Sequence, residues 1–367
     1  MPSNKSENNI MTTLTYNNSE IRFGNLLESG FNSILNSERY SNSKKIIITD
    51  ENVFELWMNH FITTFDGLKD AEIIQLPAGE DNKVLEICSH VWNALSEYEV
   101  GRNDLIINIG GGVITDMGGF IASTFKRGLS FINVPTTLLS QVDASVGGKT
   151  GIDLGPYKNQ IGVFADAEYV FIDSSYLTTL SENELESGFA EMLKHGLIAD
   201  QNYWNELQQV NPKENPYQLL ETIHKSVTIK RDIVSADHLE NGIRKHLNFG
   251  HTIGHAIEGY CLTKGETIPH GYGVAWGMIA ESYISKEMGL ITEKEFEEVN
   301  HSIRSIYPKL ALNKDVIPAL TPLLLNDKKN AGGEINFTLL TGIGKAVYDQ
   351  KVSSELIEKC FNFILYP

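Results

Sequence analysis

The sequence predicts an α/β part with a Rossmann-like, mostly parallel sheet, followed by a mainly α-helical part. Before about residue 175, short β-branched apolar runs alternate with a helical pattern, which is typical of parallel strands covered by helices. After residue 175, apolar residues recur mainly at helical spacing. A chain of 367 residues also exceeds one average domain, so we expect two domains, residues 1–175 and 176–367.

Five apolar runs of strand length predict the sheet. They are residues 45–50, 73–76, 105–109, 131–134 and 170–173. Between the second and third runs, apolar residues from 84 to 95 recur at helical spacing and predict a helix. Later in the chain, Ser181 and Glu184 form a capping-box pattern that opens a helix to about Ile198. Three more elements are expected: helices at 223–234 and 274–288 and a short strand at 335–340.

Composition and charge restrict the possible partners. Thirty Lys and Arg against 47 Asp and Glu give a net charge of −17, so neither nucleic acid nor an anionic membrane is expected to bind. An anionic ligand would therefore need a local basic cluster. Three widely spaced cysteines favour free thiols in the cytoplasm, and no apolar run is long enough to span a bilayer. Residues 1–12 contain no apolar signal core and are expected to be a flexible tail.

A glycine-rich turn follows the strand at 105–109. Gly110, Gly111 and Gly112 would let the backbone approach a pyrophosphate at the start of the next helix. Glycines also occur in ordinary turns, but the strand-to-helix context favours dinucleotide binding. A second stretch, 147–150, resembles half of an ATP-binding P-loop. The position of its first required glycine is Asp143, which excludes ATP binding.

Two histidines with helical spacing indicate a catalytic metal site. His251 and His255 share one helix face. A third imidazole, His270, and a carboxylate, Glu191, could complete a site that keeps an open coordination position. Glu191 and Lys194 are three residues apart, and they form either a surface ion pair or a buried pair that needs a metal or substrate.

Taken in chain order, these segments resemble 3-dehydroquinate synthases. The resemblance runs from about Thr49 to Lys345 and includes the glycine turn, Arg127-Gly128, 135–139, 143–151, 158–162, 188–195, 242–244 and 247–258. It implies a cytoplasmic homodimer that binds NAD in the first domain and a divalent metal, zinc or cobalt, in the second. The implied substrate is an anionic sugar phosphate, 3-deoxy-arabino-heptulosonate 7-phosphate. The implied products are 3-dehydroquinate and phosphate, within the shikimate pathway of aromatic amino acid biosynthesis.

The resemblance also assigns residues, position by position. The metal ligands would be Glu191, His251 and His270, so His255 becomes a substrate contact. The substrate cluster would be Asp143, Lys149, Asn159, Lys194, Lys230, Arg244, Asn248 and His255. Arg127 would be a phosphate anchor that reaches across the dimer interface, and Lys328 or Lys329 would supply another phosphate contact. The NAD contacts would be Asp50, Glu80, Lys83, Gly111, Gly112, Asp116, Thr136, Thr137, Lys149 and Lys158.

The implied reaction accounts for a basic cluster in an acidic protein. Arg244 suits a carboxylate through bidentate hydrogen bonds, whereas lysines act as point charges on phosphate. Transient oxidation by NAD would acidify a neighbouring C–H and allow phosphate to leave. Return of the hydride, ring opening and an intramolecular aldol step would complete a reaction with no net redox change.

Three alternatives remain at this point. Another sugar phosphate cyclase would keep NAD and metal but change the carboxylate-binding set. An iron-class polyol dehydrogenase would share the fold without needing the anion cluster, and a regulatory protein would bind both cofactors without turnover. The set of Lys230, Arg244, Asn248 and His255 favours dehydroquinate formation.

The chain departs from the common family pattern at two places. Tyr272-Gly273 follows His270-Gly271, where Glu-Ala is usual, and Asp153 and Tyr157 occupy a loop where Asn and a small or basic residue are commoner. No metal-ligand position is lost.

Overall fold

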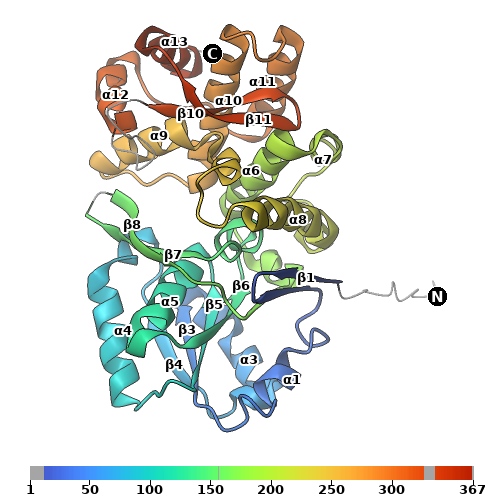
Figure 1. Cartoon of the computed structure of the whole chain (residues 1–367), viewed down its shortest axis with the longest axis vertical. Coiled ribbons are helices and arrows are strands. Elements are labelled where there is room, and N and C mark those ends of the chain that lie inside the picture. The colour runs from blue at the N-terminus through green and yellow to red at the C-terminus, as the bar shows by residue number, and fades with distance from the viewer. Residues whose placement is uncertain (1–11, 156, 326–334, 366–367) are drawn as a thin grey trace, which may run out of the picture. The chain divides into compact units, whose positions relative to one another are not determined.

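The computed structural model describes residues 12–155, 157–325 and 335–365. The chain divides into unit 1, Met1–Leu180 with Asn215–His224, and unit 2, Ser181–Glu214 with Lys225–Pro367. Strands and helices alternate in unit 1, and unit 2 is mainly helical (Figure 1). The predicted fold class is therefore confirmed.

A seven-stranded sheet forms the centre of unit 1. Its order is β1 (Thr12–Tyr16), β2 (Ser19–Phe23), β9 (Tyr169–Ile172), β6 (Ser130–Pro135), β5 (Leu105–Gly110), β3 (Lys45–Asp50) and β4 (Glu72–Leu76). Neighbours from β2 to β4 pair in parallel, while β1 is antiparallel to β2. The five predicted strands are confirmed, and the hairpin of β1 and β2 is an addition.

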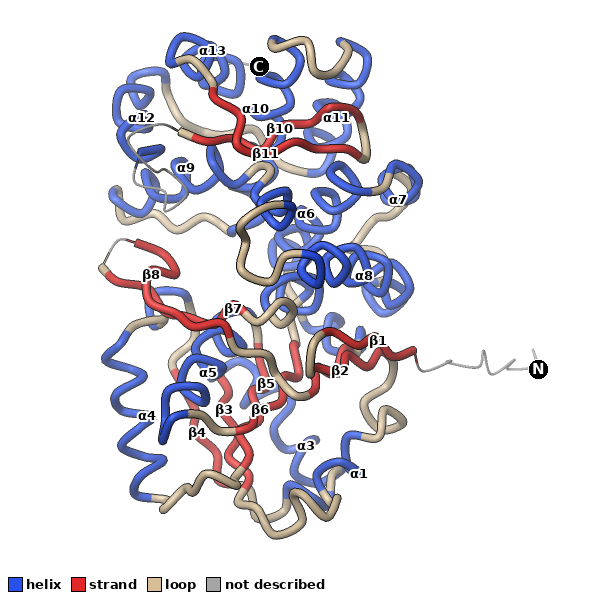
Figure 2. Tube along the Cα trace, viewed as in Figure 1, coloured by secondary structure: helices blue, strands red, loops and turns tan. Residues whose placement is uncertain are grey.

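Helices cover both faces of this sheet (Figure 2). On one face, Ile47 and Ile107 pack in a buried cluster with residues of α1 (Phe31–Leu35), α2 (Glu51–Val53) and α3 (Asn59–Thr64). The other face carries α5 (Gly112–Thr124) and α4 (Leu85–Glu97), the helix predicted at 84–95. There, a Cβ on Gly118 would lie 2.0 Å from Asn108 Oδ1, so glycine permits α5 to lie close to β5.

A second hairpin, β7 (Lys149–Leu154) and β8 (Tyr157–Phe164), was not predicted as strands. Its two strands approach closely at paired glycines, since a Cβ on Gly162 would lie 2.3 Å from the carbonyl oxygen of Thr150. Because glycines replace apolar side chains here, the alternating pattern that identifies strands is absent from the sequence.

Unit 2 is built around α10 (His270–Glu287), whose residues are mostly buried. Around it lie α6 (Glu182–Ala199), α9 (His251–Thr263), α11 (Glu293–Ile306), α13 (Ser354–Leu365) and the hairpin of β10 (Asn336–Gly342) and β11 (Lys345–Lys351). Unit 2 also contains α7 (Gln201–Leu207), α12 (Ile317–Leu325) and the part of α8 (Leu220–Ala236) that begins at Lys225.

The predicted elements of this part are also confirmed. The helix opened by Ser181 is α6, and the Ser181 hydroxyl accepts a hydrogen bond from the Glu184 N–H at 3.4 Å. The helices predicted at 223–234 and 274–288 are α8 and α10, and the late strand is β10.

Two predictions concern residues at or beyond the limits of the described ranges, and a third concerns membrane-spanning helices. The tail expected at 1–12 lies outside the described residues except for Thr12, which begins β1. Lys328 and Lys329 also lie outside them. In the described ranges, no helix has the length and apolar character needed to cross a membrane.

Candidate active site

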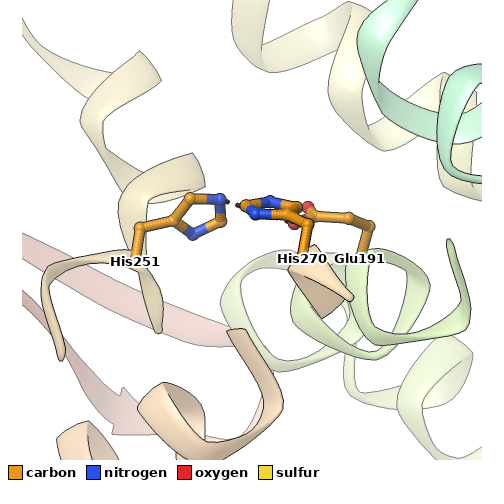
Figure 3. Close-up of side chains that lie close together, drawn as sticks. All are labelled: Glu191, His251 and His270. Atoms are coloured by element: carbon orange, nitrogen blue, oxygen red, sulfur yellow. Dashed lines mark ion pairs between the residues drawn. The ribbon is translucent and has the colours of Figure 1, made fainter. Parts of the chain in front are cut away.

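Three helices of unit 2 bring one carboxylate and two imidazoles together (Figure 3). Glu191 lies in the middle of α6, while His251 and His270 are the first residues of α9 and α10. The Nε2 atoms of His251 and His270 lie 3.4 Å and 3.6 Å from Glu191 Oε1. One potential ligand atom from each residue lies within 4.8 Å of the others. This donor set suits a zinc-like ion, with room for a substrate oxygen as a further ligand.

Both imidazoles are held through their other ring nitrogen. His251 Nδ1 lies 3.1 Å from the carbonyl oxygen of Phe249, and His270 Nδ1 lies 3.2 Å from Glu258 Oε1. A proton on each Nδ1 would donate to these oxygens and place the metal-binding lone pair on Nε2. Burial disfavours the His270 cation, but the carboxylates of Glu258 and Glu191 outweigh it and raise the His270 pKa to about 10.

Glu258 was missed as a site residue by sequence reasoning. A signal was available, because Glu258 is seven residues after His251 and therefore lies on the same face of α9. Its carboxylate is buried at 5% exposure and contacts a proposed metal ligand. Such outer carboxylates orient ligating histidines.

The pair of Glu191 and Lys194 is buried rather than exposed. Their side chains form an ion pair one turn apart on α6, with 0% and 1% of their side-chain surface exposed. Of the two alternatives that the sequence left open, the buried pair is confirmed and the surface pair is wrong. A buried ion pair costs desolvation, so its presence near the imidazoles favours a functional role.

His255 lies one turn after His251 on α9. Its ring centroid is 5.2 Å from that of His251 and 5.9 Å from that of His270. His255, Glu258 and His270 thus form a second possible ligand group. In that group Glu258 already faces the Nδ1 of His270, which leaves the Nε2 atom directed to Glu191. This geometry favours the group of Glu191, His251 and His270 over the second group as a possible metal site.

The segment before α9 carries two of the predicted substrate contacts. Arg244, 2% exposed, and Asn248 lie in the short helix Ile243–Asn248. The guanidinium of Arg244 donates to the carbonyl oxygen of His238, and the Asn248 amide donates to Glu240 Oε1 at 2.8 Å. Glu240, in a left-handed conformation at φ 61°, was not predicted.

Asp237 shapes this segment through its carboxylate. It accepts backbone N–H groups from Asn241, Gly242 and Arg244 at 3.0, 2.6 and 3.1 Å. Burial raises the pKa of Asp237, but the three donors outweigh burial and leave the pKa below its usual 3.8. Lys230, 6% exposed on α8, is another buried cation of the predicted substrate cluster.

In unit 1, the predicted NAD contacts gather at the carboxyl ends of β3, β5 and β6. Asp50 ends β3, and its carboxylate accepts the Val53 N–H at 3.0 Å. Gly111 precedes α5, where a Cβ would lie 3.0 Å from Thr137 Cγ2. Thr136, which is buried, and Thr137 follow β6. The glycine turn therefore begins a helix at the carboxyl ends of the parallel strands, where nucleotides bind in such folds.

A buried lysine links several of the other predicted contacts. Lys83 Nζ lies 2.6 Å from Asp116 Oδ2, 2.7 Å from Asn159 Oδ1 and 4.0 Å from Glu80 Oε1. Burial lowers the Lys83 pKa, but the carboxylates of Asp116 and Glu80 outweigh it and raise that pKa. The Asn159 N–H, at φ 51°, donates to Asp153 Oδ1 at 2.6 Å.

The other predicted residues of unit 1 belong to four different elements. Asp143 lies in the turn Ser140–Ala144 after Thr137, Lys149 begins β7 and is exposed, and Lys158 lies in β8. Arg127 is exposed beyond the far end of α5, whose 13 residues span roughly 20 Å. Arg127 precedes the amino end of β6, whereas Gly111 follows the carboxyl end of β5. Because β5 and β6 are parallel, the two residues lie at opposite ends of the strands.

Comparison with known proteins identifies the family. The sequence model of the 3-dehydroquinate synthase N-terminal domain matches residues 73–187, and the model of the C-terminal domain matches residues 188–330. This chain belongs to the 3-dehydroquinate synthase family. A 3-dehydroquinate synthase of Parabacteroides distasonis is 40% identical over 338 residues, which cover 92% of this chain and 95% of that protein. Another from Rippkaea orientalis is 42% identical over 289 residues, 77% and 78% of the two chains.

Solved structures confirm the fold. A 2-epi-5-epi-valiolone synthase of Streptomyces hygroscopicus, with NAD+ and Zn2+ bound, has a TM-score of 0.79 and 25% identity, covering 96% of this chain and 97% of that one. A 2-deoxy-scyllo-inosose synthase complexed with carbaglucose-6-phosphate, NAD+ and Co2+ has a TM-score of 0.81 and 24% identity, covering 97% and 100%. These two synthases thus share the fold at lower sequence identity than the family members above.

Proposed function

We propose that this chain converts 3-deoxy-arabino-heptulosonate 7-phosphate to 3-dehydroquinate and phosphate, with NAD and a zinc or cobalt ion, in the cytoplasm. The observation that carries the proposal is the convergence of Glu191, His251 and His270 beside the buried Lys194, in a chain about 40% identical to 3-dehydroquinate synthases. The chain is accordingly an enzyme, a carbon–oxygen lyase that closes a ring, and the regulatory alternative is set aside.

The two parts of the chain have different tasks in this proposal. Residues 1–175 would bind NAD, with the amides of Gly111 and Gly112 facing the pyrophosphate. Residues 176–367 would hold the metal at Glu191, His251 and His270. When bound, the metal would acidify a substrate hydroxyl, and NAD would accept and return a hydride.

The remaining side chains would position the substrate and stabilise its charges. Arg244 would bind the carboxylate through two hydrogen bonds, and Lys194 and Lys230 would balance the phosphate charge. The contacts of Arg244 and Asn248 with His238 and Glu240 hold both side chains before substrate binds. Such preorganisation lowers the cost of orienting a flexible sugar phosphate.

The family resemblance implies a homodimer, and the position of Arg127 supports this part of the proposal. This arginine is exposed, and it lies at the opposite end of the parallel strands from the glycine turn of its own unit. We assign it to the phosphate of the substrate in a second copy of the chain.

The carboxylate of the substrate separates this function from the other cyclases. We expect the wild-type enzyme to release phosphate from 3-deoxy-arabino-heptulosonate 7-phosphate and to leave a heptulose 7-phosphate without a carboxylate unchanged. Equal kcat/KM values for both compounds would contradict the proposal and favour another cyclase activity.

Replacement of the proposed carboxylate contact tests the same point from the protein side. Arg244→Ala should lower kcat/KM by roughly 10²- to 10³-fold, because a charged bidentate contact is lost, while the Kd for NAD stays within about twofold. Arg304→Ala, which removes an arginine on α11, is the matched control. Equal losses of turnover and NAD affinity in Arg244→Ala would reject the assigned role.

A further inference from the structure

We infer that Glu281 of α10 is a positioning residue for the metal ligand His251, because it caps the start of α9 from the neighbouring helix. Glu281 is fully buried. Its Oε2 atom accepts the Gly250 N–H at 2.6 Å, and its Oε1 atom accepts the Ile253 N–H at 3.1 Å. His251 lies between these two donors as the first residue of α9.

A capping box would normally provide the two hydrogen bonds that Glu281 accepts from Gly250 and Ile253. In that motif the side chain before the helix accepts the N–H of the third helical residue, here Ile253. The side chain of the third residue accepts the N–H of the capping position, here Gly250. Glu281 fulfils both functions alone, and its negative charge lies at the positive end of the α9 dipole.

The close approach of α9 and α10 explains why the cap comes from another helix. Gly250 has φ 80°, and a Cβ on it would lie 2.7 Å from Met278 Cγ and 2.8 Å from the carbonyl oxygen of Val274. A Cβ on Gly277 would lie only 1.8 Å from the carbonyl oxygen of Gly250. Serine, threonine or aspartate therefore cannot replace Gly250, and Glu281, one turn after Gly277, supplies the acceptors.

The same residue connects the helices of both imidazole ligands. Glu281 belongs to α10, which begins at His270, and it fixes the first turn of α9, which begins at His251. Loss of this cap should let the first turn of α9 fray and move the His251 ring away from Glu191. This inference rests on the proposed metal site.

Cobalt binding to the full-length enzyme tests the inference without relying on turnover. Glu281→Gln keeps the side-chain shape but loses the charge and one acceptor. We expect its Kd for Co²⁺ to rise by about 10- to 100-fold, as for other outer contacts of metal ligands, with an altered d–d absorption spectrum and an unchanged Kd for NAD. Glu281→Asp keeps the charge, but its shorter side chain cannot accept both N–H groups, so it should weaken Co²⁺ binding as well. This variant replaces Glu281→Gln in the test if the glutamine variant does not fold.

A matched control separates positioning from general loss of stability. Val299→Ala creates a cavity in the buried face of α11, in the same unit. If the Glu281 variants bind Co²⁺ with the Kd and spectrum of Val299→Ala, the inference is overturned. If the wild-type enzyme itself gives no Co²⁺ spectrum, the proposed metal site fails instead.

Discussion

The metal ligands show how far individual residues could be assigned before the structure. Helical spacing alone pairs His251 with His255, and the structure indeed places both on one face of α9. The spacing could not show which histidine faces Glu191, because Glu191 belongs to another helix. The family resemblance supplied the combination of Glu191, His251 and His270, and the fold brings these three residues together.

Removal of one proposed ligand gives the first test at this scale. His251→Ala should reduce bound metal from about one ion per chain to less than about a tenth, because two protein ligands hold zinc poorly. Metal content after gel filtration checks this prediction. His301→Ala, at an exposed position on α11, is the control. Full metal content and activity in His251→Ala would show that the ligand assignment is wrong.

The cysteines give a second test at the residue scale. Cys88, Cys261 and Cys360 are free and buried, and burial raises the pKa of the Cys88 thiol to about 12 and raises those of the other two. Because the thiolate is the reactive form, we expect the native enzyme to resist thiol reagents and the unfolded chain to react at all three sites. Rapid modification of the native enzyme, followed by mass spectrometry, would contradict this burial.

At the scale of elements, the predicted strands and helices followed from apolar periodicity, and the misses have physical causes. The strands β3, β5 and β6 are buried on both faces and are largely apolar runs, with Thr49, Asn108 and Asn133 as polar members. The hairpin β7–β8 has glycines where strands usually have apolar side chains, so the sequence contained no alternating apolar pattern by which to predict it. The hairpin β1–β2 had a usable signal, since Asn17-Asn18 forms its two-residue loop with Asn17 at φ 47°.

The β7–β8 hairpin also carries a prediction. The family resemblance leads us to expect Asn at the position of Asp153, whose carboxylate accepts the Asn159 N–H. Asp153→Asn keeps an acceptor and should leave the KM for the sugar phosphate within about twofold. Asp153→Ala should raise that KM by roughly tenfold, which corresponds to the free energy of about one hydrogen bond to a charged group. Equal KM values in both variants would show that this hydrogen bond does not position Asn159.

For the whole molecule, two features were predictable and one was not. The strand–helix alternation predicted the α/β part, and the charge of −17 predicted that anion binding depends on local cations. Lys194, Lys230 and Arg244 are indeed buried in unit 2. The cap that Glu281 provides could not be predicted, because it depends on how closely α9 and α10 approach.

The proposed dimer can be tested by subunit complementation. Arg127→Ala and His251→Ala should each be nearly inactive, but co-expressed chains should form mixed dimers with one intact site. Random pairing predicts about a quarter of wild-type activity. No recovery in purified mixed dimers would show that Arg127 does not act on the partner's substrate.

The central claim is a redox-neutral cyclisation of a sugar phosphate. The direct measurement is phosphate release from 3-deoxy-arabino-heptulosonate 7-phosphate by the metal-loaded enzyme with catalytic NAD, while absorbance follows NADH. We expect one phosphate per substrate consumed and no accumulation of NADH. Accumulating NADH without phosphate would contradict it and indicate a dehydrogenase.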